Sequence, residues 1–246
     1  MFLGNPLSKL IEKNKPSIGI IGFCIVDGSK WTMGFRGTAF CVTQSYFISA
    51  LHIYNGMSEE EKRNLKIWIL DPSDPLNYVM CDAEFLDKDI MNDCAIIKLL
   101  RPSEEINIGK DQSIKPLIMA NSDKVKEGKK VFFSGFPEST MNLSEVRREV
   151  SFVSIHAIIG AIKRNTETKK TMLFYLDTNC DKGFSGSPLF SLKTGKIIGF
   201  ITGRFAKPID EKQQRYEIVG LGIARPINPV KEFLEQINQK VGKLIK

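Results

Sequence analysis

Long apolar runs and a charged, apolar leader are both missing from this chain. No stretch of its 246 residues stays apolar for long enough to cross a bilayer as a helix. The start, Met1 to Pro6, has neither a basic segment nor a sustained apolar one, so we expect no signal peptide and a mature chain that begins near Met1. Internal repeats and low-complexity tracts are absent too, which leaves no sign of a repeat array.

An even set of cysteines and a concentrated charge block are also lacking. The cysteines are five and lie scattered through apparent strands, at Cys24, Cys41, Cys81, Cys94 and Cys180. We expect reduced thiols packed as small apolar groups, and therefore a reducing, cytoplasmic compartment. The formal net charge is +7, but lysines and arginines are interspersed with acids. A generic solvated surface is therefore expected, without a nucleic-acid partner or membrane binding.

Histidine is scarce, with only His52 and His156 in the whole chain. The scarcity matters because residues 183–188, Gly-Phe-Ser-Gly-Ser-Pro, predict a nucleophile at Ser185. The flanking glycines let the backbone turn tightly and aim consecutive N–H groups at one point beside the hydroxyl. A serine hydroxyl needs a nearby imidazole to take its proton, so one of the two histidines has to supply it.

His52 is the better candidate of the two. It follows two expected strands, 37–42 and 47–51, and lies where the second strand ends. His156 stands in an alternating apolar run on the same face as Ser154. We expect an ordinary strand histidine there, with a pocket role in the recognition of acidic substrates as the alternative.

An aspartate at the start of an apolar strand completes the set. Asp93 leads directly into Cys-Ala-Ile-Ile-Lys-Leu-Leu, and it can accept a hydrogen bond from the far nitrogen of an imidazole. Asp87 and Asp89 are close competitors, but neither leads into an aliphatic strand. Cys180, five residues before Ser185, could be a redox-sensitive neighbour or a thiol nucleophile, although a buried thiol is favoured.

In their order and spacing these stretches resemble the trypsin-like (chymotrypsin-fold) serine peptidases, and within them the bacterial HtrA-type protease domain without a PDZ module. Residues 116–131 are similar to the mid-chain segment of that branch, and residues 220–228 to its last strand. The resemblance runs from about Ile18 to Phe233. Four separate motifs in the right order make it specific.

The resemblance implies a serine endopeptidase that acts on protein or peptide substrates. Its catalytic triad would be His52, Asp93 and Ser185, and the backbone N–H groups of Gly183 and Ser185 would form the oxyanion hole. No metal and no organic cofactor are implied. The alternative is a non-hydrolytic peptide-binding module on the same fold, which would show damage to the triad or to the oxyanion loop, and none is visible in the sequence.

The strand-rich pattern and the resemblance together predict an all-β fold of two six-stranded antiparallel β-barrels, chymotrypsin-like, with a C-terminal α-helix. We expect a short N-terminal helix or arm over residues 1–16, capped by Asn5. The first barrel is expected over residues 17–135, the second over 136–227 and the C-terminal helix over 228–246.

Two departures from the resembling family bear on control. Secreted members bracket the catalytic histidine with a disulfide, and its two positions here hold Gly37 and Ile53. Secreted members also carry an aspartate, which pairs with a newly cut N-terminus, where this chain has Phe184. Activation by N-terminal cleavage is therefore not expected. Control would come from a regulatory protein partner, from substrate access or from a loop rearrangement.

Substrate choice is less well defined by the sequence. Counting back from the nucleophile puts Thr178 near the base of the primary pocket, and no aspartate there supports a choice of Lys or Arg. A strand that ends in Thr202, Gly203 and Arg204 should line the pocket wall and pair with an extended peptide. Arg204 could favour an acidic or polar side chain, or it could point to water.

Overall fold

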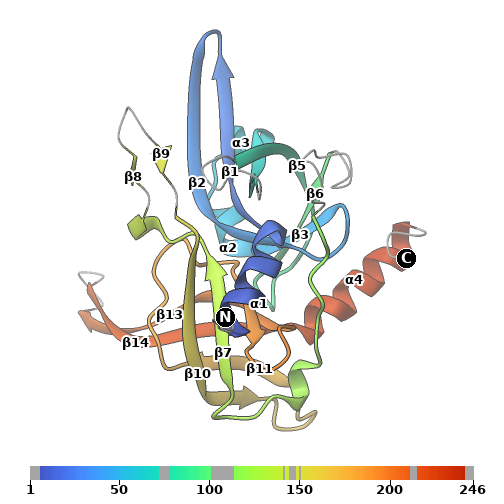
Figure 1. Ribbon diagram of the computed structural model, residues 1–246, viewed down its shortest axis with the longest axis vertical. Coiled ribbons are helices and arrows are strands. Elements are labelled where there is room, and N and C mark those ends of the chain that lie inside the picture. Colours follow the sequence, from blue (N-terminus) through green and yellow to red (C-terminus); the bar gives the residue numbers. More distant parts are fainter. Residues whose placement is uncertain are drawn as a thin grey trace, which may run out of the picture.

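The architecture is almost entirely β and consists of two closed barrels of six antiparallel strands each (Figure 1). The computed structural model describes residues 6–71, 78–100, 114–140, 142–143, 148–149, 151–210 and 215–241. Helix α4 (Asn228–Val241) follows the last strand. The predicted fold class is therefore confirmed. Among the described residues, no helix is both long enough and apolar enough to span a membrane.

The first barrel is built from the first six strands. Around the barrel they run β1 (Ile18–Asp27), β2 (Lys30–Cys41), β3 (Tyr46–Ala50), β6 (Cys94–Leu99), β5 (Tyr78–Asp89) and β4 (Leu65–Leu70). Strands β1 and β2 continue as a hairpin far beyond the barrel (Figure 1). The hairpin turns at Gly28, whose φ of 57° is one that glycine adopts without strain.

The second barrel includes strand β7 (Lys130–Gly135), which the sequence predicted to belong to the first. Around the barrel the strands run β10 (Val153–Arg164), β11 (Thr171–Leu176), β14 (Arg215–Pro226), β13 (Ile197–Asp210), β12 (Pro188–Ser191) and β7 (Lys130–Gly135). Phe132 of β7 lies opposite His156 on one side and Phe190 on the other. The expected boundary at residue 135 is therefore wrong, because β7 closes the second barrel.

Short helices and short strands lie before the first barrel strand and between the others. They are α1 (Pro6–Asn14), η1 (Lys15–Ser17), α2 (Leu51–Asn55), α3 (Glu59–Arg63), η3 (Ser122–Lys124), η4 (Glu138–Thr140), β8 (Asn142–Leu143) and β9 (Arg148–Glu149). Helix α3 begins with a capping box: Ser58 Oγ accepts a hydrogen bond from the Glu61 N–H, and a Glu61 carboxylate oxygen accepts one from the Ser58 N–H. Asn5, the expected cap of α1, lies outside the described residues.

The apolar core has three parts, one inside each barrel and one between them. Strand alternation explains how one strand serves two of these parts, since neighbouring side chains point to opposite faces. In β3, for example, Phe47 points into the first barrel and Ile48 into the seam. Phe132 and Phe200 of the second barrel and Leu234 of α4 complete the seam. This packing fixes the two barrels relative to each other.

A polar cluster attaches the start of α4 to the second barrel. Asn228 Oδ1 accepts a hydrogen bond from the Ser122 N–H at 3.0 Å, and Asn228 Nδ2 donates to Asp123 Oδ2 at 2.7 Å. The other oxygen of Asp123 accepts from the Thr171 N–H at 2.8 Å. Burial acts to raise the pKa of Asp123, but the hydrogen bonds outweigh it and hold the pKa below its ordinary value.

Asp123→Ala is expected to lower the free energy of unfolding at pH 7 by about 2 kcal/mol, because two hydrogen bonds to a charged group are lost. A lowered folded-state pKa gives stability that is present above the unfolded value of about 4 and is lost as the pH falls through the folded value. Urea unfolding of both proteins from pH 7 to pH 3 should therefore show the difference shrinking toward acid. Asp27→Ala, on the exposed hairpin, is the control. If the difference in the free energy of unfolding grew toward acid, Asp123 would not have the lowered pKa described above.

Candidate active site

The register of the first barrel places His52 beside Asp93. Strand β3 pairs with β6 so that Ala50 lies opposite Cys94, and the next residue along, Leu51, donates its N–H to the Asp93 carbonyl at 2.9 Å. The chain then enters α2, and His52 is the second residue of this short helix rather than the end of a strand as predicted. The first turn of α2 aims the imidazole at the seam between the barrels.

Asp93 holds both the backbone and the ring of His52. Its Oδ1 accepts a hydrogen bond from the His52 N–H at 2.9 Å, and its Oδ2 lies 2.7 Å from Nδ1 of the imidazole. Asp93 has a φ of 52°, a left-handed conformation that aspartate tolerates better than most residues. The competitors are engaged locally, since Asp87 accepts from the Lys88 N–H and Asp89 from Asn92.

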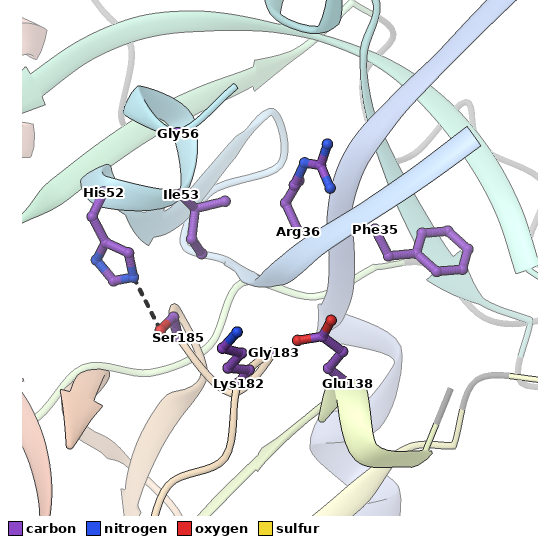
Figure 2. A pocket seen from close by; sticks show the side chains of 9 residues that line it. All are labelled: Phe35, Arg36, His52, Ile53, Gly56, Glu138, Lys182, Gly183 and Ser185. Atoms are coloured by element: carbon purple, nitrogen blue, oxygen red, sulfur yellow. Dashed lines mark hydrogen bonds between the residues drawn. The ribbon is translucent and has the colours of Figure 1, made fainter. Parts of the chain in front are cut away.

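Ser185 reaches the same imidazole from the second barrel. Its Oγ lies 3.1 Å from His52 Nε2 (Figure 2). The structure thus brings together the three residues that the sequence analysis singled out. The His52 side chain is 47% exposed and the Asp93 side chain 22% exposed. A substrate can therefore reach the imidazole, while the carboxylate is more shielded.

The backbone around Gly183 leaves its N–H without a protein acceptor in the described part of the chain. The carbonyl of Lys182 accepts a hydrogen bond from the Glu138 N–H at 2.7 Å. In a trans peptide the N–H points away from the carbonyl, so the Gly183 N–H points away from Glu138. Gly183 has a φ of 91°, and a Cβ there would collide with the Phe136 carbonyl oxygen. Only glycine fits this position.

The N–H of Ser185 is arranged in the same way. The Phe184 carbonyl accepts a hydrogen bond from the Ser187 N–H at 2.8 Å, which directs the Ser185 N–H the opposite way. Among the described residues that N–H has no acceptor. Phe184 is 1% exposed and packs edge-on against Phe133, with ring centroids 5.0 Å apart. Apolar packing therefore anchors the loop at the position where the secreted peptidases carry an aspartate.

A cavity of about 280 Å³ opens beside Ser185 and is lined by both barrels (Figure 2). The first barrel contributes Phe35, Arg36, His52, Ile53 and Gly56, and the second contributes Glu138, Lys182, Gly183 and Ser185. Arg36 is ion-paired with Glu61. Arg36, Glu138 and Lys182 were not predicted as site residues. They come from three separate segments, and no motif in the sequence marks them, although Lys182 directly precedes the nucleophile loop.

The predicted substrate residues lie outside this cavity, around Gly222 of β14. Residues 202–204 belong to β13, where Arg204 pairs opposite Gly222. A Cβ added to Gly222 would lie 2.5 Å from Cys180 Sγ and 3.1 Å from the Thr178 carbonyl oxygen. Thr178 and Arg204 are thus brought to the same glycine. Ile201, next to Thr202 on the same strand, accepts a hydrogen bond from the Gly186 N–H at 2.7 Å and donates one to the Ser187 carbonyl at 2.8 Å. These two bonds hold β13 beside the nucleophile loop.

All five cysteines are free and buried, as expected for reduced thiols. Burial, with a smaller contribution from Asp181, raises the pKa of Cys180 to about 12, and the charge of Arg204 only partly opposes this. The thiol therefore stays protonated near neutral pH, which is contrary to a thiolate nucleophile. At the two family disulfide positions, a Cβ on Gly37 would collide with the Ile53 side chain, so isoleucine fills the space beside His52.

The remaining candidates stay outside the site. His156 is exposed on β10, opposite Phe132 of β7, and does not line the cavity. In the part of the chain that the structure describes, no group of three or more histidine, cysteine, aspartate or glutamate residues could hold a metal ion.

The family model for the trypsin-like peptidase domain matches residues 37–200. Two curated relatives, both described as a serine protease HtrA-like and coming from two strains of Staphylococcus epidermidis, are 23% identical over 163 residues. The match covers 66% of this chain but 25% of each relative. The chain thus spans about a quarter of the length of these proteins.

Solved structures share the fold. The HtrA-type protease AlgW with a decapeptide superposes with a TM-score of 0.66 at 16% identity, covering 94% of this chain and 67% of that chain. Deg5 superposes with a TM-score of 0.63 at 17% identity, covering 92% of this chain and 91% of that chain. At such low identity these structures establish the fold alone.

Proposed function

Because this chain belongs to the trypsin-like peptidase family, we propose that it is a serine endopeptidase that uses His52, Asp93 and Ser185 as its catalytic triad. The observation that carries the proposal is the position of one imidazole between two partners. Nδ1 of His52 lies 2.7 Å from Asp93 Oδ2, and Nε2 lies 3.1 Å from Ser185 Oγ. Both distances are within hydrogen-bonding range, and this is the arrangement that activates a serine hydroxyl.

In the proposed mechanism, Ser185 Oγ attacks the carbonyl carbon of the scissile peptide bond. His52 Nε2 takes the hydroxyl proton during the attack and later gives it to the leaving amine. Asp93 accepts a hydrogen bond from the Nδ1–H group of His52 without taking the proton. This bond fixes the tautomer and stabilises the imidazolium. A water molecule, activated by the same imidazole, then hydrolyses the acyl-enzyme.

The oxyanion hole of the proposal consists of the N–H groups of Gly183 and Ser185. Both groups lie on the loop that bears the nucleophile, and neither has an acceptor among the described residues. As the substrate carbonyl becomes tetrahedral, its oxygen gains negative charge, and preorganised N–H donors then stabilise it more strongly than they stabilise the ground state.

An extended peptide is the proposed substrate. The relative AlgW is named as a complex with a decapeptide. In this chain, β12 pairs with β13 no further than Phe200, so residues 202–204 keep one strand edge without a β12 partner next to the nucleophile loop. Backbone pairing along such an edge is a common way to bind extended peptides. A module that only holds peptides would use the same edge, which makes it the second candidate.

A fluorophosphonate probe tests the proposal. Wild-type protein should be labelled, and mass spectrometry of the labelled peptide should find the phosphonyl group on Ser185 rather than on Ser187 or Cys180. Heat-denatured protein is the control, because labelling depends on a folded triad. A folded wild type that takes up no label would count against the endopeptidase and favour the peptide-binding module.

Arg204→Ala is expected to lower kcat/KM for peptides with Glu or Asp before the scissile bond by about tenfold and to leave neutral peptides unaffected, because a charge-assisted hydrogen bond is removed. Arg204 is partly buried, faces Gly222 in the pair of strands and has no ion-pair partner among the described residues. A peptide-library profile measures the effect. Lys193→Ala removes the same charge from an exposed turn and is the control. An unchanged profile in Arg204→Ala would remove Arg204 from the site.

The proposal also places the protein in a reducing, intracellular environment and leaves its control to a partner or a conformational switch. The five free cysteines support the first point. The burial of Phe184 supports the second, since the phenyl ring cannot form an ion pair with a new N-terminus. Activity of the purified chain without added protein would argue against a required partner.

A further inference from the structure

Thr38, a fully buried residue of β2, contacts the nucleophile loop at two points. Its hydroxyl donates a hydrogen bond to the Gly183 carbonyl at 2.9 Å, and its N–H donates to the Ser185 carbonyl at 2.9 Å. Gly183 and Ser185 are also the residues whose N–H groups form the oxyanion hole proposed above. One residue of the first barrel, through its side chain and its backbone, therefore holds both ends of a three-residue segment of the second.

The same residue connects to the other parts of the site. The Phe136 N–H donates to Thr38 Oγ1 at 3.1 Å, and Phe136 precedes by two residues Glu138, whose N–H holds the Lys182 carbonyl. The Ser49 hydroxyl donates a hydrogen bond to the Thr38 carbonyl at 2.7 Å, and Ser49 lies three residues before His52 in the sequence. All the hydrogen-bonding groups of Thr38 are thus used, and each of them leads to a segment that carries a site residue.

We propose that the Thr38 hydroxyl is a positioning group that fixes the peptide plane joining the two N–H groups of the oxyanion hole and so sets these groups relative to His52. The inference rests on the proposed endopeptidase function. The Gly183 N–H belongs to the peptide 182–183 and the Ser185 N–H to the peptide 184–185, so the peptide 183–184 joins them. Rotation of this joining plane would move one N–H relative to the other. The Thr38 hydroxyl holds the joining plane through the Gly183 carbonyl, and Thr38 itself touches no reacting atom.

The hydroxyl cannot be replaced by an apolar group without a specific loss. In Thr38→Val the shape is kept, but the Phe136 N–H and the Gly183 carbonyl both lose their partner in a buried place. Gly135 lies directly beside the hydroxyl, and a Cβ there would collide with the Ser187 side chain, so the surroundings are closely packed. The loop can then regain hydrogen bonds only by turning its peptide planes, which misdirects the oxyanion N–H groups.

The test compares Thr38→Val, Thr38→Ser and wild type on a fluorogenic peptide that the wild type cleaves, and on the rate of fluorophosphonate labelling. Oxyanion donors act in the transition state, so a misaligned hole lowers kcat and leaves KM unchanged. We expect kcat of Thr38→Val to fall by about 10- to 100-fold, less than the loss of a whole donor. Thr38→Ser keeps the hydroxyl and should retain kcat within about threefold.

Thr171→Val is the matched control. Thr171 is another buried threonine with a hydrogen-bonded hydroxyl, but it belongs to the cluster that holds α4 and does not line the cavity. It should lower the midpoint of thermal unfolding without changing kcat. If Thr38→Val yields no folded protein, Thr38→Cys replaces it, because a thiol is a weak donor and should give an intermediate kcat.

Three outcomes would overturn the inference. A folded Thr38→Val with wild-type kcat would show that the hydroxyl positions nothing that catalysis needs. Equal losses of kcat in Thr38→Val and Thr171→Val would show a general effect of stability. A wild type that neither cleaves peptides nor reacts with the probe would end the endopeptidase proposal first and this inference with it.

Discussion

Ser185→Ala protein is expected to bind peptides as the wild type does and to hydrolyse them about 10⁶-fold more slowly, which is the loss found when the nucleophile of a serine protease of another fold is removed. The physical reason is the loss of covalent catalysis. Without Oγ, His52 has no hydroxyl to activate, and water has to attack the peptide bond unaided. The proposed oxyanion hole and the proposed substrate edge of β13 remain in the variant, so binding should be kept.

The test measures both hydrolysis and peptide binding. Kcat is followed with a fluorogenic peptide, and binding is followed by fluorescence anisotropy of a labelled, uncleaved peptide. Ser191→Ala is the control variant: Ser191 is buried on β12 and its hydroxyl has no hydrogen-bond partner in the described structure, so kcat should stay within about twofold. Hydrolysis that survives in Ser185→Ala would mean that another group is the nucleophile. Peptide binding without hydrolysis in the wild type would favour the binding module.

The three residues of the proposed triad, which the structure brings together, could be picked out from the sequence because each stands in a local pattern. A serine between two glycines, an aspartate directly before an aliphatic strand and a histidine directly after an apolar one can each be recognised within about eight residues. The strand register of the first barrel then sets the distance between two of them, since the pairing of Ala50 with Cys94 brings His52 to Asp93. Local patterns are enough to predict site residues when the fold holds each pattern at a fixed position.

The boundary between the barrels could not be predicted in the same way. Strand β7 carries three consecutive apolar residues, Val131, Phe132 and Phe133. Such a run indicates that both faces of the strand are buried but does not show against which sheet. Its partners, β10 and β12, begin 23 and 58 residues after the start of β7. The pairing is set by contacts across these distances, so the sequence assigned β7 to the wrong barrel.

Thr38 shows the same limit at the site. Its hydroxyl binds the carbonyl of a residue 145 positions away. A buried threonine in a strand has no local feature that separates it from other β-branched core residues. Arg36, Glu138 and Lys182 also meet only in the folded chain. The sequence therefore missed Thr38 and these lining residues, while the three residues of the proposed triad stand in local patterns.

Asp93→Asn is expected to lower kcat by about 10⁴-fold at an unchanged KM, the value known for the equivalent change in the fold family that defines this triad. The structure gives the reason. Asp93 Oδ1 accepts a hydrogen bond from the His52 backbone N–H, so in the variant the amide oxygen has to occupy that place. The amide NH₂ then faces Nδ1 of His52, which has to become an acceptor.

An imidazole that accepts at Nδ1 carries its proton at Nε2, the nitrogen that lies 3.1 Å from Ser185 Oγ. In this tautomer the imidazole cannot take the serine proton, so kcat falls although the geometry is kept. Nitrogen NMR shifts of the ring report the tautomer directly and should change together with kcat. Asp87→Asn removes the same charge nearby. Among the described residues the Asp87 carboxylate accepts a hydrogen bond only from the Lys88 N–H, so the variant should leave kcat and tautomer unchanged. Wild-type activity in Asp93→Asn, or an equal loss in Asp87→Asn, would mean that Asp93 does not act by orienting the imidazole.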